Sequence, residues 1–80
     1  MSQQEKLIAK FKAANGVFKW SDLVSLLKGL GFEQYEGAGS RVSFQNGSII
    51  IKLHKPHPQK EVKAYAVRQV KEVLISEGLI

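Results

Sequence analysis

The sequence predicts an α+β fold of two layers, in which a three-stranded antiparallel sheet has helices packed on one face, in the order α-α-β-β-β-α. Three observations predict it: two segments with helical apolar spacing come first, a hairpin signal lies in the middle, and a third helical segment closes the chain. The 80 residues, 44% apolar and 24% charged, have the composition of a globular protein. We therefore expect a single domain over residues 1–80.

The first two segments carry their apolar residues on one side of a helix. A short helix is predicted over residues 3–14, stopped by Asn15-Gly16, and a second helix is predicted from Ser21, as its N-cap, to Gly31. The two apolar stripes consist of Leu7, Ile8, Phe11 and Ala14, and of Trp20, Leu23, Val24, Leu27 and Leu30. The pattern leaves open whether helix 3–14 belongs to the core or is an addition to a core over residues 20–79.

A short strand and a hairpin are predicted next. The strand covers residues 32–36, and Gly37-Ala38-Gly39 turns the chain. Asn46-Gly47, between residues 41–45 and 48–54, predicts a two-residue type I′ turn. That turn places Gln45 opposite Ser48 and fixes the register of the strands on either side.

The predicted register gives the hairpin one apolar face and one polar face. The apolar face, which we expect to be buried against the helices, carries Val42, Phe44, Ile49, Ile51 and Leu53. The other face places Ser43 opposite Ile50 and Arg41 opposite Lys52, with His54 next along the same face. Three nitrogen-bearing side chains are therefore expected at one end of an open sheet face.

Two prolines separate the sheet from the last helix. Pro56 and Pro58 favour extended backbone at Lys55 and His57, because a residue before proline avoids the helical region. The closing helix is predicted from about residue 61 to residue 77, with Gly78 as its stop. Its apolar stripe consists of Val62, Ala66, Val67, Val70, Val73 and Leu74.

The charge of the chain narrows the class of partner. Twelve Lys and Arg against seven Asp and Glu leave a net charge of +5, which is typical of a protein that binds a polyanion, although lysines can also serve solubility alone. Without cysteine the chain has no disulfide and no thiolate metal site. No apolar run approaches the ~20 residues that cross a bilayer, so we expect a cytoplasmic protein without membrane contact.

Three stretches, in this order, resemble a known family. They are the helix WSDLVSLLKGLGF at 20–32, the strand GSRVSF at 39–44, and HKPHP at 54–58, before a closing helix. From Trp20 to Leu79 the chain resembles HicA (YcfA-like) toxins of type II toxin-antitoxin systems. The resemblance implies a fold like that of the double-stranded-RNA-binding domain, cleavage of single-stranded or loosely structured mRNA, and neutralisation by a HicB-like antitoxin.

One position departs from the family pattern. Where the family has a histidine after Gly-Ser, this chain has Arg41, which cannot readily act as a general acid or base because it stays protonated. Arg41 can still stabilise charge on phosphate, and proton transfer then falls to His54 or His57, the two histidines of the sequence. The candidate catalytic residues are therefore His54, His57 and Arg41, and the candidate RNA-binding residues are Arg41, Lys52, Lys55, Lys60 and Lys63.

Each candidate also has a structural interpretation. Arg41 could pair with Glu33 or Glu36 across the sheet, His54 could be a partly buried histidine bonded to backbone, and the lysines could form a solvated face. Trp20 continues an apolar stripe, which favours core packing over base stacking. Two histidines so close together offer too few ligands for a metal, and we expect no cofactor and no small-molecule ligand.

Three functions remain open. The first is a ribonuclease toxin that cleaves mRNA without a metal. The second is a non-catalytic RNA-binding module, in which arginine for histidine has removed the chemistry while phosphate binding remains. The third is an adaptor whose basic face binds only an acidic partner protein.

Overall fold

The predicted α+β architecture is confirmed. The computed structural model describes residues 3–57 and 59–80, which form three helices and five strands. They are α1 (Gln3–Ala13), β1 (Phe18–Lys19), α2 (Trp20–Gly29), β2 (Glu33–Glu36), β3 (Arg41–Asn46), β4 (Ile49–His54), β5 (Glu61–Val62) and α3 (Ala64–Ser76). Strands β2, β3 and β4 form an antiparallel sheet in that order, while β1 and β5 pair separately.

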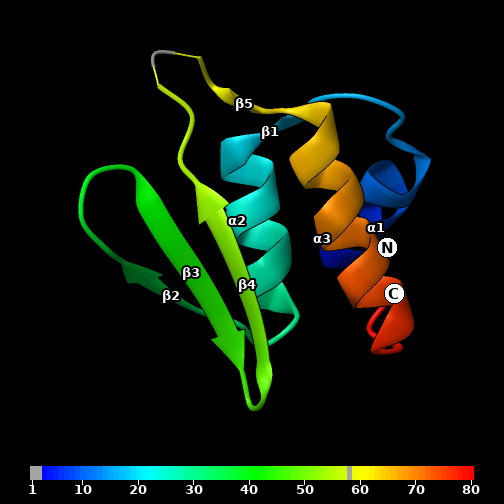
Figure 1. Ribbon diagram of the computed structural model, residues 1–80. Helices are drawn as coiled ribbons and strands as arrows, with labels where there is room; N and C mark the ends of the chain where they lie inside the picture. Colours follow the sequence, from blue (N-terminus) through cyan, green and yellow to red (C-terminus); the bar gives the residue numbers. More distant parts are fainter. Residues whose placement is uncertain (1–2, 58) are drawn as a thin grey trace.

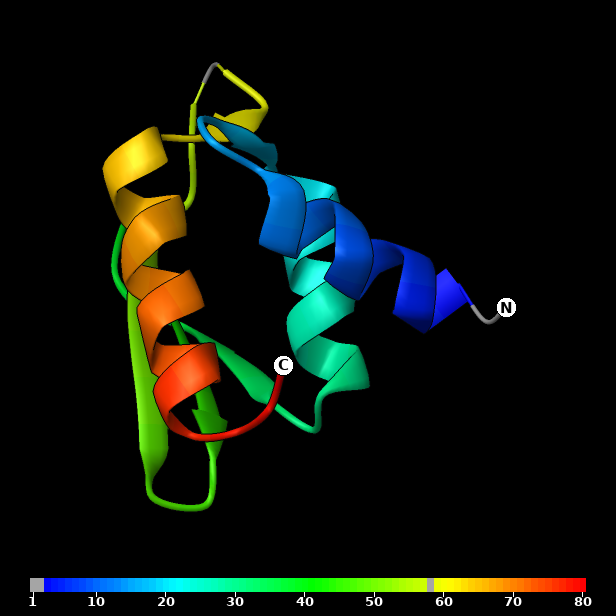
Figure 2. The same ribbon diagram turned by 90° about the vertical axis from the view of Figure 1, so that its right-hand side faces the viewer.

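The helices leave one face of the β2-β3-β4 sheet open. In Figure 1, α2 lies behind the sheet, α3 runs beside β4, and nothing covers the sheet on the viewer's side. Figure 2 shows α1 against α2, on the side away from the sheet. Burial follows this arrangement, because the side chains of Val42, Phe44, Ile51 and Leu53 are buried whereas Arg41 and Lys52 are exposed. The predicted faces are confirmed, except that Ile49, next to the turn, is only half-buried.

The hairpin turn differs from the prediction by one residue. Asn46 pairs with Ile49, so the two turn residues are Gly47 and Ser48. Gly47 has a φ of 61° and no described non-glycine residue has a positive φ, which fits a type II′ turn and excludes type I′. The Asn46 side chain is engaged elsewhere, since its Nδ2 donates to the Leu30 carbonyl oxygen at the end of α2 (3.2 Å).

This change shifts the register by two residues and keeps the parity of the faces. Phe44 pairs with Ile51 instead of Ile49, and Arg41 pairs with His54 instead of Lys52. Lys52 now lies opposite Ser43. The polar face therefore carries the predicted side chains in a different pairing.

The short β1-β5 ladder sets the start of two helices. Phe18 pairs with Val62 and Lys19 with Glu61, so residues 61–62 are a strand and α3 begins at Ala64, later than predicted. The prediction of Ser21 as N-cap is also wrong, since α2 begins at Trp20, whose N–H donates to the Lys60 carbonyl (2.9 Å). A contact between segments 40 residues apart thus overrides the local capping signal.

Helix α1 packs into the same core as the rest of the chain. Phe11 is completely buried, with its ring edge-to-face with Phe18 at a centroid distance of 5.1 Å. On α3, the Nζ of Lys71 donates to the carbonyl oxygen of Ala14 at 2.6 Å and of Lys12 at 3.3 Å. Lys71 therefore satisfies carbonyl groups that the end of α1 leaves without helical partners.

Candidate nucleic-acid interface

Arg41 and His54 lie directly opposite each other on the open face of the sheet. The Lys55 N–H donates to the Ser40 carbonyl (2.7 Å), so the neighbouring Arg41–His54 pair is of the non-hydrogen-bonded type, in which opposed side chains come closest. The backbone hydrogen bonds of Arg41 are consistent with this pair type, because they do not go to β4. The Arg41 N–H donates to the Ala38 carbonyl, and the Arg41 carbonyl accepts from the Gly37 N–H. The fold thus places a guanidinium beside an imidazole at the end of the hairpin.

A shallow hollow of about 430 Å³ lies around this pair. Lys52 lines it together with Arg41 and His54, and the three side chains are exposed. The full lining is Gly37, Arg41, Val42, Ser43, Lys52, Leu53 and His54. The structure therefore brings together three of the predicted site residues in what we call the sheet-face hollow.

Among the described residues, no acidic side chain lines the sheet-face hollow. Over residues 3–57 and 59–80, the one salt bridge joins Lys10 to Asp22, on α1 and α2. Arg41 thus makes no ion pair with Glu33 or Glu36. The Glu33 carboxylate instead accepts a hydrogen bond from the Tyr35 hydroxyl, and this bond with the nearby negative charge raises the pKa of Tyr35 above its usual 10.0. The positive charge of Arg41 is left available to an anion.

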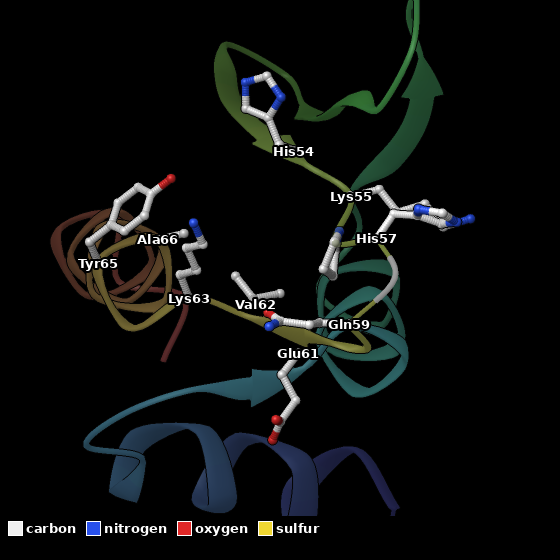
Figure 3. Close-up of a pocket in the computed structure, with 10 residues that line it drawn as sticks. His54, Lys55, His57, Gln59, Glu61, Val62, Lys63, Tyr65 and Ala66 are labelled. Carbon is white, nitrogen blue, oxygen red and sulfur yellow. The ribbon is translucent and has the colours of Figure 1, made fainter.

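A second hollow, of about 530 Å³, opens on the other side of His54. It lies between the end of β4, β5 and the first turn of α3, as Figure 3 shows, and we call it the helix-side hollow. Its lining consists of His54, Lys55, Pro56, His57, Gln59, Glu61, Val62, Lys63, Tyr65 and Ala66. His54 is thus the residue that the two hollows share.

The side chains around the helix-side hollow do not all point the same way. In Figure 3 the ends of Lys63 and Tyr65 point toward the side on which His54 lies. The His57 imidazole points away from His54, and the Glu61 carboxylate points to the opposite side. His54 and His57 therefore do not converge on one point, although both line the hollow.

The remaining candidates are more scattered. Lys60 lines a different hollow of about 410 Å³, which also contains Trp20 and Lys55. Trp20 is half-buried, with its ring 6.0 Å from that of Phe44, so it packs on the core as the apolar stripe predicts. No three side chains of the kinds that bind metals come together in the described part of the chain.

The sequence interpretation missed Tyr65. Its side chain is 60% exposed in the first turn of α3, off the apolar stripe on which the helix prediction rests. The signal in the sequence is an aromatic residue two positions after Lys63 and five after Lys60, because basic and aromatic residues that alternate are typical of nucleic-acid binders.

None of the described helices is long and apolar enough to cross a membrane.

Comparison with known proteins identifies the family. No curated protein and no solved structure matches the chain. A family model described as the HicA toxin of bacterial toxin-antitoxin matches residues 20–74, which include α2, the whole sheet and most of α3. Since this match covers more than half of the chain and contains the Arg41–His54 pair, the protein belongs to the HicA toxin family.

Proposed function

We propose that this protein is a cytoplasmic toxin that binds single-stranded or loosely structured mRNA and cleaves it without a metal ion. Membership of the HicA family makes it the toxin of a toxin-antitoxin system. The observation that carries the RNA chemistry is the Arg41–His54 pair, which is exposed on a sheet face and has no salt bridge to an acidic side chain among the described residues. We further propose that a HicB-like antitoxin neutralises it.

The two side chains suit different parts of the reaction. The guanidinium of Arg41 can hold two oxygens of the scissile phosphate and stabilise the charge that develops on them. His54 accepts the proton of the 2′-hydroxyl as the 2′-oxygen bonds to phosphorus. The bond from phosphorus to the 5′-oxygen breaks, and the imidazolium returns the proton to that oxygen. The products are a 2′,3′-cyclic phosphate and a 5′-hydroxyl.

The lysines supply attraction that does not depend on RNA sequence. Lys52 in the sheet-face hollow and Lys55 and Lys63 in the helix-side hollow are exposed and lie on either side of His54. A strand that passes over His54 meets positive charge before and after the scissile phosphate. Lys60 lines a separate hollow together with Trp20, so it would contact a longer RNA.

A non-catalytic RNA-binding module is the second candidate. Arg41 favours it, because it stands where the resemblance places the family's histidine, and arginine binds phosphate without transferring protons. In that case the hollows bind RNA and the chain leaves it intact.

A cleavage assay on labelled RNA separates the two. We expect the parent to cleave, and His54→Gln to lower the rate by ~10²- to 10⁴-fold, as is typical for loss of a general acid or base. His57→Gln is the matched control, because His57 points away from His54, and it should retain most of the activity. Loss of activity in His57→Gln alone would assign the proton transfer to His57. A parent that binds RNA without cutting it is the non-catalytic module.

A further inference from the structure

We infer that the helix-side hollow is a nucleotide subsite, in which Tyr65 stacks on the base next to the scissile phosphate and Lys63 contacts that nucleotide's phosphate. This inference rests on the proposed RNA binding and adds a position at which a base, and not only the backbone, is held.

The exposure of Tyr65 is the first observation. Its side chain is 60% exposed, the largest value among the exposed large hydrophobic side chains of the described chain. The Tyr65 hydroxyl has no hydrogen-bond partner among the described residues, whereas the Tyr35 hydroxyl donates to the Glu33 carboxylate. A planar ring that neither packs in the core nor holds a neighbour is free to receive a base.

The surroundings of Tyr65 are the second observation. Lys63 and Tyr65 point toward the side of His54, while the carboxylate of Glu61, the one acidic residue of the lining, points away (Figure 3). The cavity therefore presents an aromatic face and positive charge together. A docking site for a protein side chain would be expected to have a more apolar floor.

Continuity with the reacting pair is the third observation. His54 lines both hollows, so RNA whose phosphate lies between Arg41 and His54 extends directly into the helix-side hollow with its next nucleotide. The volume of about 530 Å³ lies within the range of small-molecule sites and admits a nucleotide. Stacking is sequence-tolerant because every base has a π-face, so the subsite takes any base.

The test measures binding of a labelled 2′-fluoro RNA decamer, which lacks the 2′-hydroxyl needed for cleavage. Tyr65→Ala should weaken binding by about 5- to 100-fold, the usual cost of losing one stacked base, while Tyr65→Phe should bind as the parent does. Ile75→Ala is the matched control, because Ile75 is also exposed (52%) but lies ten residues further along α3. Lys63→Gln should lower the slope of log affinity against log salt by about 0.7, and Lys28→Gln, on α2, should leave it unchanged.

Photocrosslinking gives a positive readout. A decamer with 5-iodouridine should crosslink to Tyr65 and not to Tyr35, as peptide mass spectrometry would show.

The outcomes separate the subsite from the proposed function. If Tyr65→Ala binds RNA as tightly as the parent while Arg41→Ala binds it more weakly, the subsite is wrong and the proposed function stands. If Tyr65→Ala instead loses affinity only for the antitoxin, the hollow is a protein contact and the inference is wrong. If the parent protein does not bind RNA at all, both the subsite and the proposed function are wrong.

Discussion

Arg41 and His54 occupy opposed positions on β3 and β4, on the open face of the sheet, and no carboxylate of the described residues forms a salt bridge with either. An arginine in this position keeps its charge at every physiological pH, whereas the imidazole can gain and lose a proton. The pair thus combines a side chain that only donates hydrogen bonds with one that can both donate and accept them. A register in which Arg41 faced Lys52 would place two permanent cations together and move the imidazole one pair away.

Replacement of Arg41 should weaken RNA binding through charge. Arg41→Ala is expected to lower affinity on every RNA sequence and to reduce the salt slope by about 0.7, because one phosphate contact is lost on a single strand. Arg41→Lys should keep the salt slope, because the charge is retained, but lose part of the affinity, because an ammonium cannot form the bidentate hydrogen bonds of a guanidinium. Fluorescence anisotropy over a salt series measures both. An unchanged slope in Arg41→Ala would mean that Arg41 does not touch the RNA backbone.

The faces of the sheet could be predicted from the sequence, whereas the pairing could not. Alternation in strands has a period of two, so a register shift of two residues leaves Val42 and Phe44 buried and Arg41 exposed. The turn itself depends on Asn46, whose amide bonds to Leu30 sixteen residues earlier. A local turn signal contains no information about that contact.

The missing parts of the prediction share one cause. Strands β1 and β5 have two residues each and exist only because distant segments meet, so no periodicity could reveal them. The position of Tyr65 in the hollow that His54 also lines likewise depends on where α3 starts, after the β1-β5 pairing. The sequence did indicate His54, His57, Lys55 and Lys63, which line the helix-side hollow, but that Tyr65 joins them could be seen only in the tertiary structure.

Charge reversal on the sheet face should weaken the complex with the antitoxin. If an acidic surface covers Arg41 and Lys52, the double variant Arg41→Glu with Lys52→Glu puts like charges together and should lower affinity at least about tenfold, mainly through slower association. Lys6→Glu with Lys28→Glu, at exposed positions of α1 and α2, makes the same change in net charge elsewhere. Equal effects of the two double variants, measured by calorimetry, would place the antitoxin on another surface.

Removal of the Phe11 ring tests whether α1 stabilises the fold. Phe11→Ala creates a cavity at a completely buried position and should lower the free energy of unfolding by about 3–5 kcal/mol. Leu7→Ala, at a half-buried position of the same helix, should cost less. Urea denaturation followed by Trp20 fluorescence gives both values. A cost below about 1 kcal/mol for Phe11→Ala would mean that α1 is an appendage in solution.

The Tyr35–Glu33 contact should be visible in an alkaline titration. The hydrogen bond and the nearby negative charge both raise the pKa of the Tyr35 hydroxyl above 10.0. A pKa that is higher in the folded state means that this contact stabilises the fold below pH ~10, and that the contribution is lost as the pH rises through the raised value. In a Tyr65→Phe background, Glu33→Ala should lower the midpoint of the Tyr35 absorbance change. Glu36→Ala, on the same strand but the other face, should not shift it.

The substitution that decides the chemistry is Arg41→His, which installs the residue that the resemblance leads us to expect after Gly39-Ser40. Its imidazole would lie opposite His54, so one ring could take the 2′-hydroxyl proton while the other donates to the 5′-oxygen. We expect the cleavage rate near neutral pH to rise by about 10²-fold or more, and the rate to pass through a maximum with pH, since an acid and a base are then both required. Ser43→His, on the same face but opposite Lys52, is the matched control and should not raise the rate. If Arg41→His cleaves and the parent leaves RNA intact at every pH, arginine has removed the chemistry and the natural protein is a non-catalytic RNA binder. If Arg41→His cuts no faster than a parent that depends on His54, position 41 serves phosphate binding alone.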